Sequence, residues 1–194
     1  MEVMRDNVFN NKPRKKVKGF TLIELLIVIA IIAVLATAVT LILNPAELLK
    51  QGRDSTRLSD LSTIHTALGL YLADVASPNF SALSNCTVGT TSPFNYDSSA
   101  CTENATTTVD GNGWVAVNFT DISSGSSLSR LPVDPVNDAE YYYAYVQTTS
   151  ETYEINANME SVRYATTTST SVEDNDGGDN NDWYEVGNAA GLDL

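Results

Sequence analysis

A single carboxylate lies near the start of a long apolar stretch, KGFTLIELLIVIAIIAVLATAVTLILNP, which begins at Lys18. Glu24 is the only charged residue between Phe20 and Leu43. An ionised side chain costs about 2.5–3.5 kcal/mol at the centre of a bilayer and less near its interface. Glu24 is therefore a cost to a helix that lies only in lipid, and a tolerated interfacial glutamate is one interpretation of it.

A second group of carboxylates lies near the C-terminus, in the segment VEDNDGGDNNDWYEVG (172–187). Ca²⁺ takes six to eight oxygen ligands, and the two glycines at 177 and 178 let the backbone turn between such ligands. An EF-hand is not expected, because an aspartate stands where a loop starting at residue 174 requires glycine. A solvated acidic loop without metal is the alternative. The candidate calcium ligands are Asp174, Asp176, Asp179, Asp182 and Glu185.

Cys86 and Cys101 lie in a segment rich in Ser, Thr and Asn. A segment that follows a membrane-spanning stretch is exported, and disulfides persist outside the cytoplasm. The sequence therefore predicts a disulfide, with unpaired thiols as the alternative. Two thiols and one distant histidine, His65, do not make a zinc site.

His65 is the only histidine and follows Ile64 in a predicted helix, so it is interpreted as a helix-flank or core residue. No serine or cysteine has a base partner other than this histidine, and no glycine-rich phosphate loop follows a strand. The sequence therefore predicts that the protein is not an enzyme and needs no essential cofactor, calcium being the one candidate ligand.

The charges divide the 194-residue chain into two parts. Residues 1–19 carry a net charge of +4, and residues 20–194 carry a net charge of −17. A basic segment before an apolar stretch stays on the cytoplasmic side of a membrane. The acidic remainder argues against a nucleic-acid partner, which would require a basic surface.

The elements that must position these residues begin with a helix over 20–43. Its 24 residues span about 36 Å, which is enough for a bilayer core of about 30 Å and longer than the apolar core of a secretory signal peptide. Asn44-Pro45 predicts a break. Helical periodicity then resumes over 44–78 as an amphipathic half that ends at Pro78. Its apolar stripe is Leu58, Leu61, Ile64, Leu68, Leu72 and Val75, and its polar face is Arg57, Asp60, Thr63 and Thr66.

Short strand-like runs follow in residues 79–194. Strands are predicted at 114–119, 141–147 and 152–158, the last two as a hairpin. Alternation would place Tyr141, Tyr143 and Tyr145 on one face. The segment RLPVDPVND (130–138) is expected to be an ordered loop that leads into the sheet. The predicted fold is α+β: a long N-terminal helix, with a membrane half and an amphipathic half, packed against a small antiparallel sheet in a domain that carries the disulfide loop and the acidic loop.

The segment KGFTLIELLIVIAIIAVLATAV resembles the class III signal and N-terminal helix of type IV prepilins and pseudopilins. The resemblance implies that prepilin peptidase removes residues 1–19 as a basic leader by cleaving after Gly19. It also implies that the peptidase methylates the new amino terminus at Phe20. Glu24 would then compensate the terminal amine of a neighbouring subunit in a filament.

A weaker resemblance lies downstream. LPVDP followed by a tyrosine-rich strand is similar to major pseudopilins of type II secretion systems, in which a C-terminal loop binds calcium. The Trp-Gly pair usual after the second proline is replaced here by Val136-Asn137. This difference leaves the particular secretion or pilus system open.

The expected function is that of a structural subunit of a type IV pilus-like filament. The resemblance implies a single-pass protein of the cytoplasmic membrane that later joins an extracellular or periplasmic homopolymer. Its implied partners are prepilin peptidase, the inner-membrane assembly machinery, the membrane and further copies of itself. The alternatives are a type II secretion major pseudopilin and, from a different class, a membrane-anchored binding module that does not polymerise.

Overall fold

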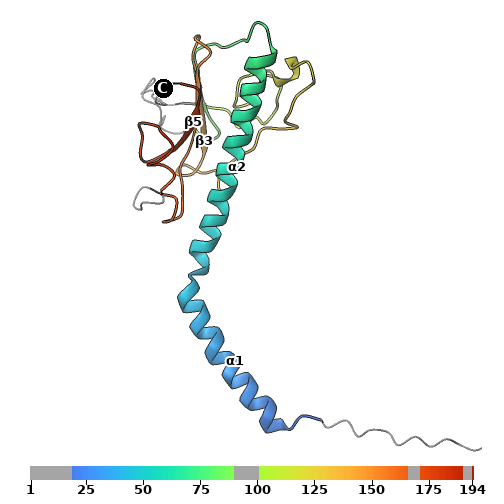
Figure 1. Cartoon of the computed structure of the whole chain (residues 1–194), viewed down its shortest axis with the longest axis vertical. Coiled ribbons are helices and arrows are strands. Elements are labelled where there is room, and N and C mark those ends of the chain that lie inside the picture. The colour runs from blue at the N-terminus through green and yellow to red at the C-terminus, as the bar shows by residue number, and fades with distance from the viewer. Residues whose placement is uncertain (1–18, 90–100, 166–170, 190–193) are drawn as a thin grey trace, which may run out of the picture. The chain divides into compact units, whose positions relative to one another are not determined.

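The computed structural model describes residues 19–89, 101–165, 171–189 and Leu194. The chain divides into two compact units, residues 1–44 and residues 45–194. The first unit contains α1 (Leu22–Leu43), and the second contains α2 (Pro45–Asp74), the short 3₁₀ helix η1 (Phe119–Asp121) and a sheet (Figure 1). Apart from Gly19, the predicted leader lies outside the described residues.

The predicted break between the two helices is present. α1 ends at Asn44, whose backbone adopts the left-handed region with φ of 38° and ψ of 75°. α2 starts at the next residue, Pro45, where the missing N–H removes no helical hydrogen bond. The α1 sequence supplies no polar face, whereas α2 is amphipathic, so the break separates two helices with different surroundings.

α2 packs one side against the sheet and ends earlier than the sequence predicts, at Asp74 rather than just before Pro78. Its buried face includes Leu61, Ile64 and Leu68 of the predicted stripe. Thr63 and Thr66 are exposed, as predicted for the polar face, and Asp60 is half-buried. Arg57 was also predicted for that polar face. The prediction is wrong, because its side chain is buried in ion pairs with Asp54 and Asp134.

The sheet of the described residues has five strands in the order β2-β1-β3-β4-β5. β3 (Tyr143–Gln147) and β4 (Tyr153–Ala157) form the predicted antiparallel hairpin. β5 (Tyr184–Gly187) pairs antiparallel with β4, and β1 (Leu83–Cys86) pairs antiparallel with β3. β2 (Thr102–Glu103) pairs parallel with β1, so the sheet is mixed and not wholly antiparallel as predicted.

The strand predicted at 114–119 is wrong. Trp114, Val117 and Phe119 are buried, which explains the apolar pattern, but this segment is irregular and leads into η1. Its backbone bonds to a neighbouring loop instead of to the sheet: the N–H of Trp114 donates to the carbonyl of Thr106 at 2.9 Å. The pattern therefore identified core residues and gave the wrong backbone conformation.

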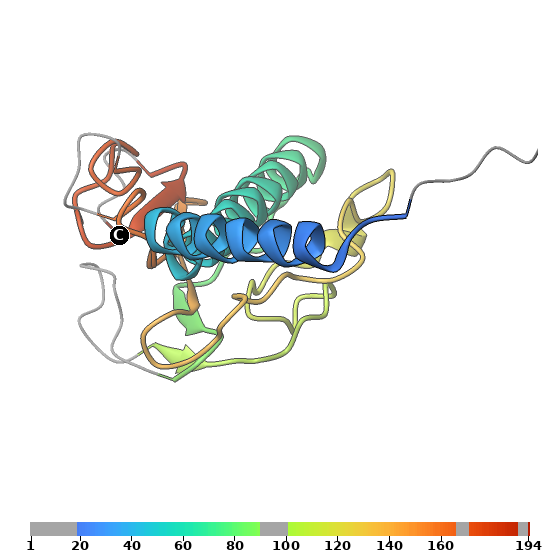
Figure 2. The same cartoon turned by 90° about the horizontal axis from the view of Figure 1, so that it is seen from below.

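The core lies between α2 and the sheet. Tyr143 and Tyr145 of β3 share the face that points toward α2, as predicted, whereas Tyr141 precedes the strand. Figures 1 and 2 show the segment around η1 and the C-terminal segment on opposite sides of α2. On the opposite face of the sheet, Cys86, Ala144 and other side chains are buried beneath the C-terminal segment.

Candidate functional site

The residues of the predicted cleavage motif lie in an extended segment just before α1. Gly19 is exposed, and nothing lies within 4 Å of the position that a Cβ would take there. Phe20 is 85% exposed. The peptide bond between these two residues is therefore accessible to a peptidase.

Glu24 closes a capping box at the start of α1. Thr21 Oγ1 accepts the N–H of Glu24 at 3.2 Å, and Glu24 Oε2 accepts the N–H of Thr21 at 3.3 Å. Each side chain thereby satisfies a backbone donor that the helix leaves unpaired, and the carboxylate also interacts favourably with the helix dipole. Our sequence reasoning missed this local role, although the T-x-x-E spacing is its known signature. The pair with a neighbouring subunit's Phe20 amine stays a prediction.

The rest of α1 presents apolar side chains on all sides. Leu22–Thr40 is long and apolar enough to cross a membrane, and none of it is buried within the described chain. The large hydrophobic side chains that the structure describes in α1 remain 45% exposed or more. A surface of this kind has to be covered by lipid or by other protein chains.

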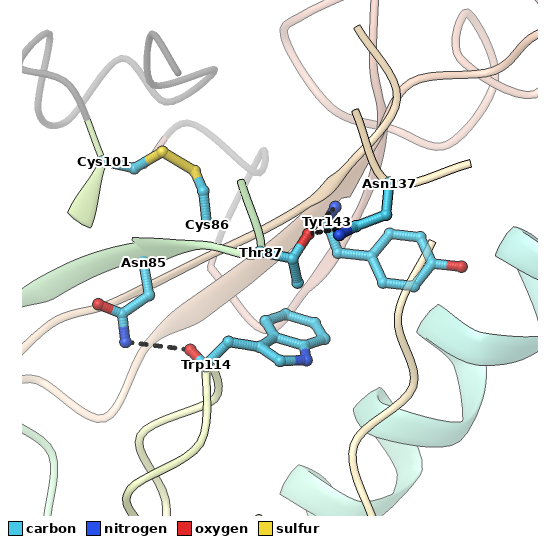
Figure 3. Close-up of a disulfide and its surroundings, with 7 residues drawn as sticks. All are labelled: Asn85, Cys86, Thr87, Cys101, Trp114, Asn137 and Tyr143. Atoms are coloured by element: carbon cyan, nitrogen blue, oxygen red, sulfur yellow. Dashed lines mark hydrogen bonds between the residues drawn. A yellow bond between two sulfur atoms is a disulfide. The ribbon is translucent and has the colours of Figure 1, made fainter. Parts of the chain in front are cut away.

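Cys86 and Cys101 form the predicted disulfide, with Cα atoms 5.7 Å apart (Figure 3). The bond joins the end of β1 to the residue before β2, on the face of the sheet that points away from α2. The adjacent Asn85 points to the other face, and its Nδ2 donates to the carbonyl of Trp114 at 3.1 Å. Residues 90–100, inside the disulfide loop, lie outside the described part of the chain.

Arg57 is fully buried and holds α2 to a distant loop. Its Nε and Nη2 donate to the two carboxylate oxygens of Asp134 at 2.6 Å and 2.9 Å, and its Nη1 donates to Asp54 at 2.7 Å. The planar guanidinium matches a carboxylate in this two-bond geometry, which makes such pairs strong. Asp134 is the aspartate of LPVDP, so the motif serves as an anchor for that loop.

The same ion cluster also fixes the segment after β4. Asp54 accepts the N–H groups of Glu160 and Ser161 at 2.9 Å and 2.8 Å. Arg53 Nε donates to Glu160 Oε2 at 2.7 Å, and this bond lowers the pKa of the Glu160 carboxyl. The charges of the cluster are satisfied by one another, which makes its role structural.

The five predicted calcium ligands do not face a common centre. Asp174, Asp179 and Asp182 are exposed, Asp176 is half-buried and Glu185 is buried. In the part of the chain that the structure describes, no three His, Cys, Asp or Glu side chains are grouped to hold a metal ion. In this arrangement the loop does not fit the oxygen shell that calcium requires. Calcium binding itself stays a prediction.

Glu185 lies instead beside Glu154, on the sheet face that points away from α2. Burial raises the pKa of Glu154 to about 8 and that of Glu185 to about 7. The N–H of Leu194 donates to Glu154 Oε2 at 3.1 Å. Neither carboxylate takes part in the salt bridges found among the described residues. The two acids therefore favour their protonated forms more than exposed carboxylates do.

His65 occupies the flank of α2, as predicted. Its Nδ1 lies 3.0 Å from Tyr153 Oη, and burial raises the pKa of Tyr153 to about 12. A cavity of about 580 Å³ beside it is lined by residues of α2, β5 and the 171–176 segment. The tyrosine keeps its proton at neutral pH, so this pair is a structural hydrogen bond.

Residues 14–40 match the model of the prokaryotic N-terminal methylation motif. No curated protein and no solved structure matches the chain. The match supports a class III signal of the type IV pilin-like or pseudopilin kind and does not resolve which of the two. The motif implies processing by prepilin peptidase and, together with the apolar helix α1, supports anchoring in a membrane. Proteins with this motif are usually structural subunits and not enzymes.

Proposed function

We propose that this protein is the subunit of a type IV pilus-like filament, stored in the membrane and polymerised through α1. The observation that carries the proposal is the combination of the methylation motif with a helix that is apolar on every side and buries nothing within its own chain. Lipid covers that helix in the stored protein, and the helices of other copies cover it in the filament.

Processing prepares the chain for assembly. Hydrolysis of the Gly19–Phe20 peptide bond releases the basic leader and creates an amine at Phe20, which is then methylated. This new cation lies just before the N-cap of α1, Thr21, in the same chain as Glu24. In a filament, the Phe20 ammonium of one copy would form an ion pair with the Glu24 carboxylate of a neighbour. The two charges would compensate each other in a low-dielectric core.

The folded unit after Asn44 is the exported part in this proposal. Its disulfide is consistent with an oxidising compartment. In this proposal the basic residues before α1 stay on the cytoplasmic side, as basic segments that flank a membrane-spanning helix do, and the assembly machinery and the peptidase would act there.

A type II secretion major pseudopilin is the second candidate within this class. The observation that favours it is the LPVDP loop, which leads into β3 and is anchored by the pair between Asp134 and Arg57. A membrane-anchored binding module that does not polymerise is the candidate from another class, and it gives no role to the charge of Glu24.

Mass spectrometry of the protein from membranes that also contain prepilin peptidase tests the processing step. We expect a mature chain that begins at N-methyl-Phe20. A chain that retains Met1 in the presence of an active peptidase, or one that is cleaved after residue 43, would contradict the proposal.

A further inference from the structure

β5 forms one edge of the sheet, because β4 is its only neighbour among the described strands. The N–H of Asn188 donates to the carbonyl of Tyr153 at 3.1 Å, which sets the alternation along the strand. The N–H groups of Glu185 and Gly187 therefore point away from β4, toward the free edge. Such edges attract other strands unless the protein covers or occupies them.

Asp176 occupies part of this edge. Its Oδ2 accepts the N–H of Glu185 at 2.8 Å, in the place where a further strand would supply a carbonyl. Its Oδ1 accepts the N–H of Gly178 at 2.9 Å, within the turn that leads back to β5. One half-buried carboxylate thus joins the turn to the edge strand.

Glu185 also holds this turn in place. Its Oε2 accepts the N–H of Asn180 at 3.0 Å. A Cβ at Gly178 would overlap this oxygen, so a larger residue there would displace the carboxylate from its bond with Asn180. The bonded oxygens of the two acids are therefore directed at backbone amides of the turn and of β5.

We infer that the acidic C-terminal segment is closed by its own backbone, with Asp176 capping the free edge of β5 and Glu185 holding the preceding turn, and that it folds without calcium. The geometry divides the five acids into two groups. Asp176 and Glu185 are internal acceptors of backbone N–H groups, whereas Asp174, Asp179 and Asp182 are exposed. A calcium loop would instead need oxygens from both groups around one ion.

Thermal unfolding of the full chain in detergent, with millimolar CaCl₂ or with EDTA, tests this inference. We expect the same Tm in both conditions. Asp176→Ala should lower the Tm by about 5 °C, because a backbone donor at the sheet edge loses its acceptor. Gly178→Ala should lower it as well, through the contact with Glu185.

The matched control is the double variant Asp174→Ala/Asp182→Ala, which removes two exposed carboxylates and should keep the wild-type Tm. A Tm that calcium raises in the wild type and not in the double variant would overturn the inference. So would an Asp176→Ala variant as stable as the wild type. If Asp176→Ala does not fold, the comparison of calcium with EDTA in the wild type still decides. The test requires neither processing nor assembly, so its outcome is independent of the proposed function.

Discussion

The two units of this chain differ in how far their apolar surface is covered and in how their charged side chains are paired. In residues 19–44, the apolar surface of α1 is exposed and the single acid, Glu24, meets only the first turn of its own helix. In residues 45–194, the core is covered, and even a fully buried arginine, Arg57, has its carboxylates within the same unit. Among the described residues, the second unit covers its apolar core and pairs its buried arginine, whereas α1 leaves its apolar surface to other molecules.

This difference separates stability from assembly. A substitution inside the second unit should change its free energy of unfolding and leave the surface of α1 unaltered. A substitution at Glu24 should do the reverse. A variant that changes both properties would contradict this separation.

The largest expected effect on the second unit comes from Arg57→Met. It leaves the buried carboxylates of Asp54 and Asp134 without their cation, which should cost about 3–5 kcal/mol of unfolding free energy. Chemical denaturation of the full chain in detergent measures this loss. Arg130→Met is the matched control, because Arg130 is exposed, and it should change stability by less than about 0.5 kcal/mol.

Removal of the disulfide should have the next largest effect. Cys86→Ser/Cys101→Ser opens a loop whose ends are 15 residues apart, which corresponds to about 3 kcal/mol in the chain-entropy description. Denaturation of the double variant should equal that of the wild type under reducing conditions. A double variant as stable as the oxidised wild type would show that the bond adds nothing to the second unit.

The buried acids should make stability depend on pH. Burial raises the pKa values of Glu154 and Glu185, so the folded chain holds protons that the unfolded chain releases above about pH 4.5. Stability should therefore fall as the pH rises from 5 to 8. Unfolding midpoints measured across this range should show the fall, and Glu154→Gln should flatten it. A stability that increases steadily up to pH 8 would contradict the direction of these shifts.

The smallest expected effect lies in the first unit. Thr21→Ala removes the hydroxyl that accepts the N–H of Glu24, and this loss should weaken the start of α1 by about 1 kcal/mol. Amide hydrogen exchange in detergent should show faster exchange in the first turn of α1 and no change in the second unit. Unchanged exchange at Glu24 would show that the capping box contributes little to the helix.

Local sequence patterns predicted much of the fold. The apolar run predicted α1, Asn44-Pro45 predicted the break, and two strand-like runs predicted the β3–β4 hairpin. These features depend on residues close in sequence. β5 was not predicted, because its four residues lie inside a segment whose acidic composition indicated a loop.

Arg57 shows why the rest could not be predicted. It lies four residues before Leu61 and seven before Ile64, so helical periodicity places it on the buried face. A charged residue on that face indicates burial only when its partner is known, and Asp134 is 77 positions away. The acidic loop shows the same limit, because composition identifies oxygen ligands but not the direction in which each side chain points.

The most direct test of the central claim compares Glu24→Gln with Glu24→Ala in filament assembly. Glutamine preserves the capping box and removes the charge, whereas alanine removes both. With processing confirmed by mass spectrometry, sedimentation and electron microscopy should show filaments for the wild type and none for either variant. Filaments from Glu24→Gln at wild-type yield would contradict the claim that Glu24 forms an ion pair with the Phe20 amine of a neighbouring subunit.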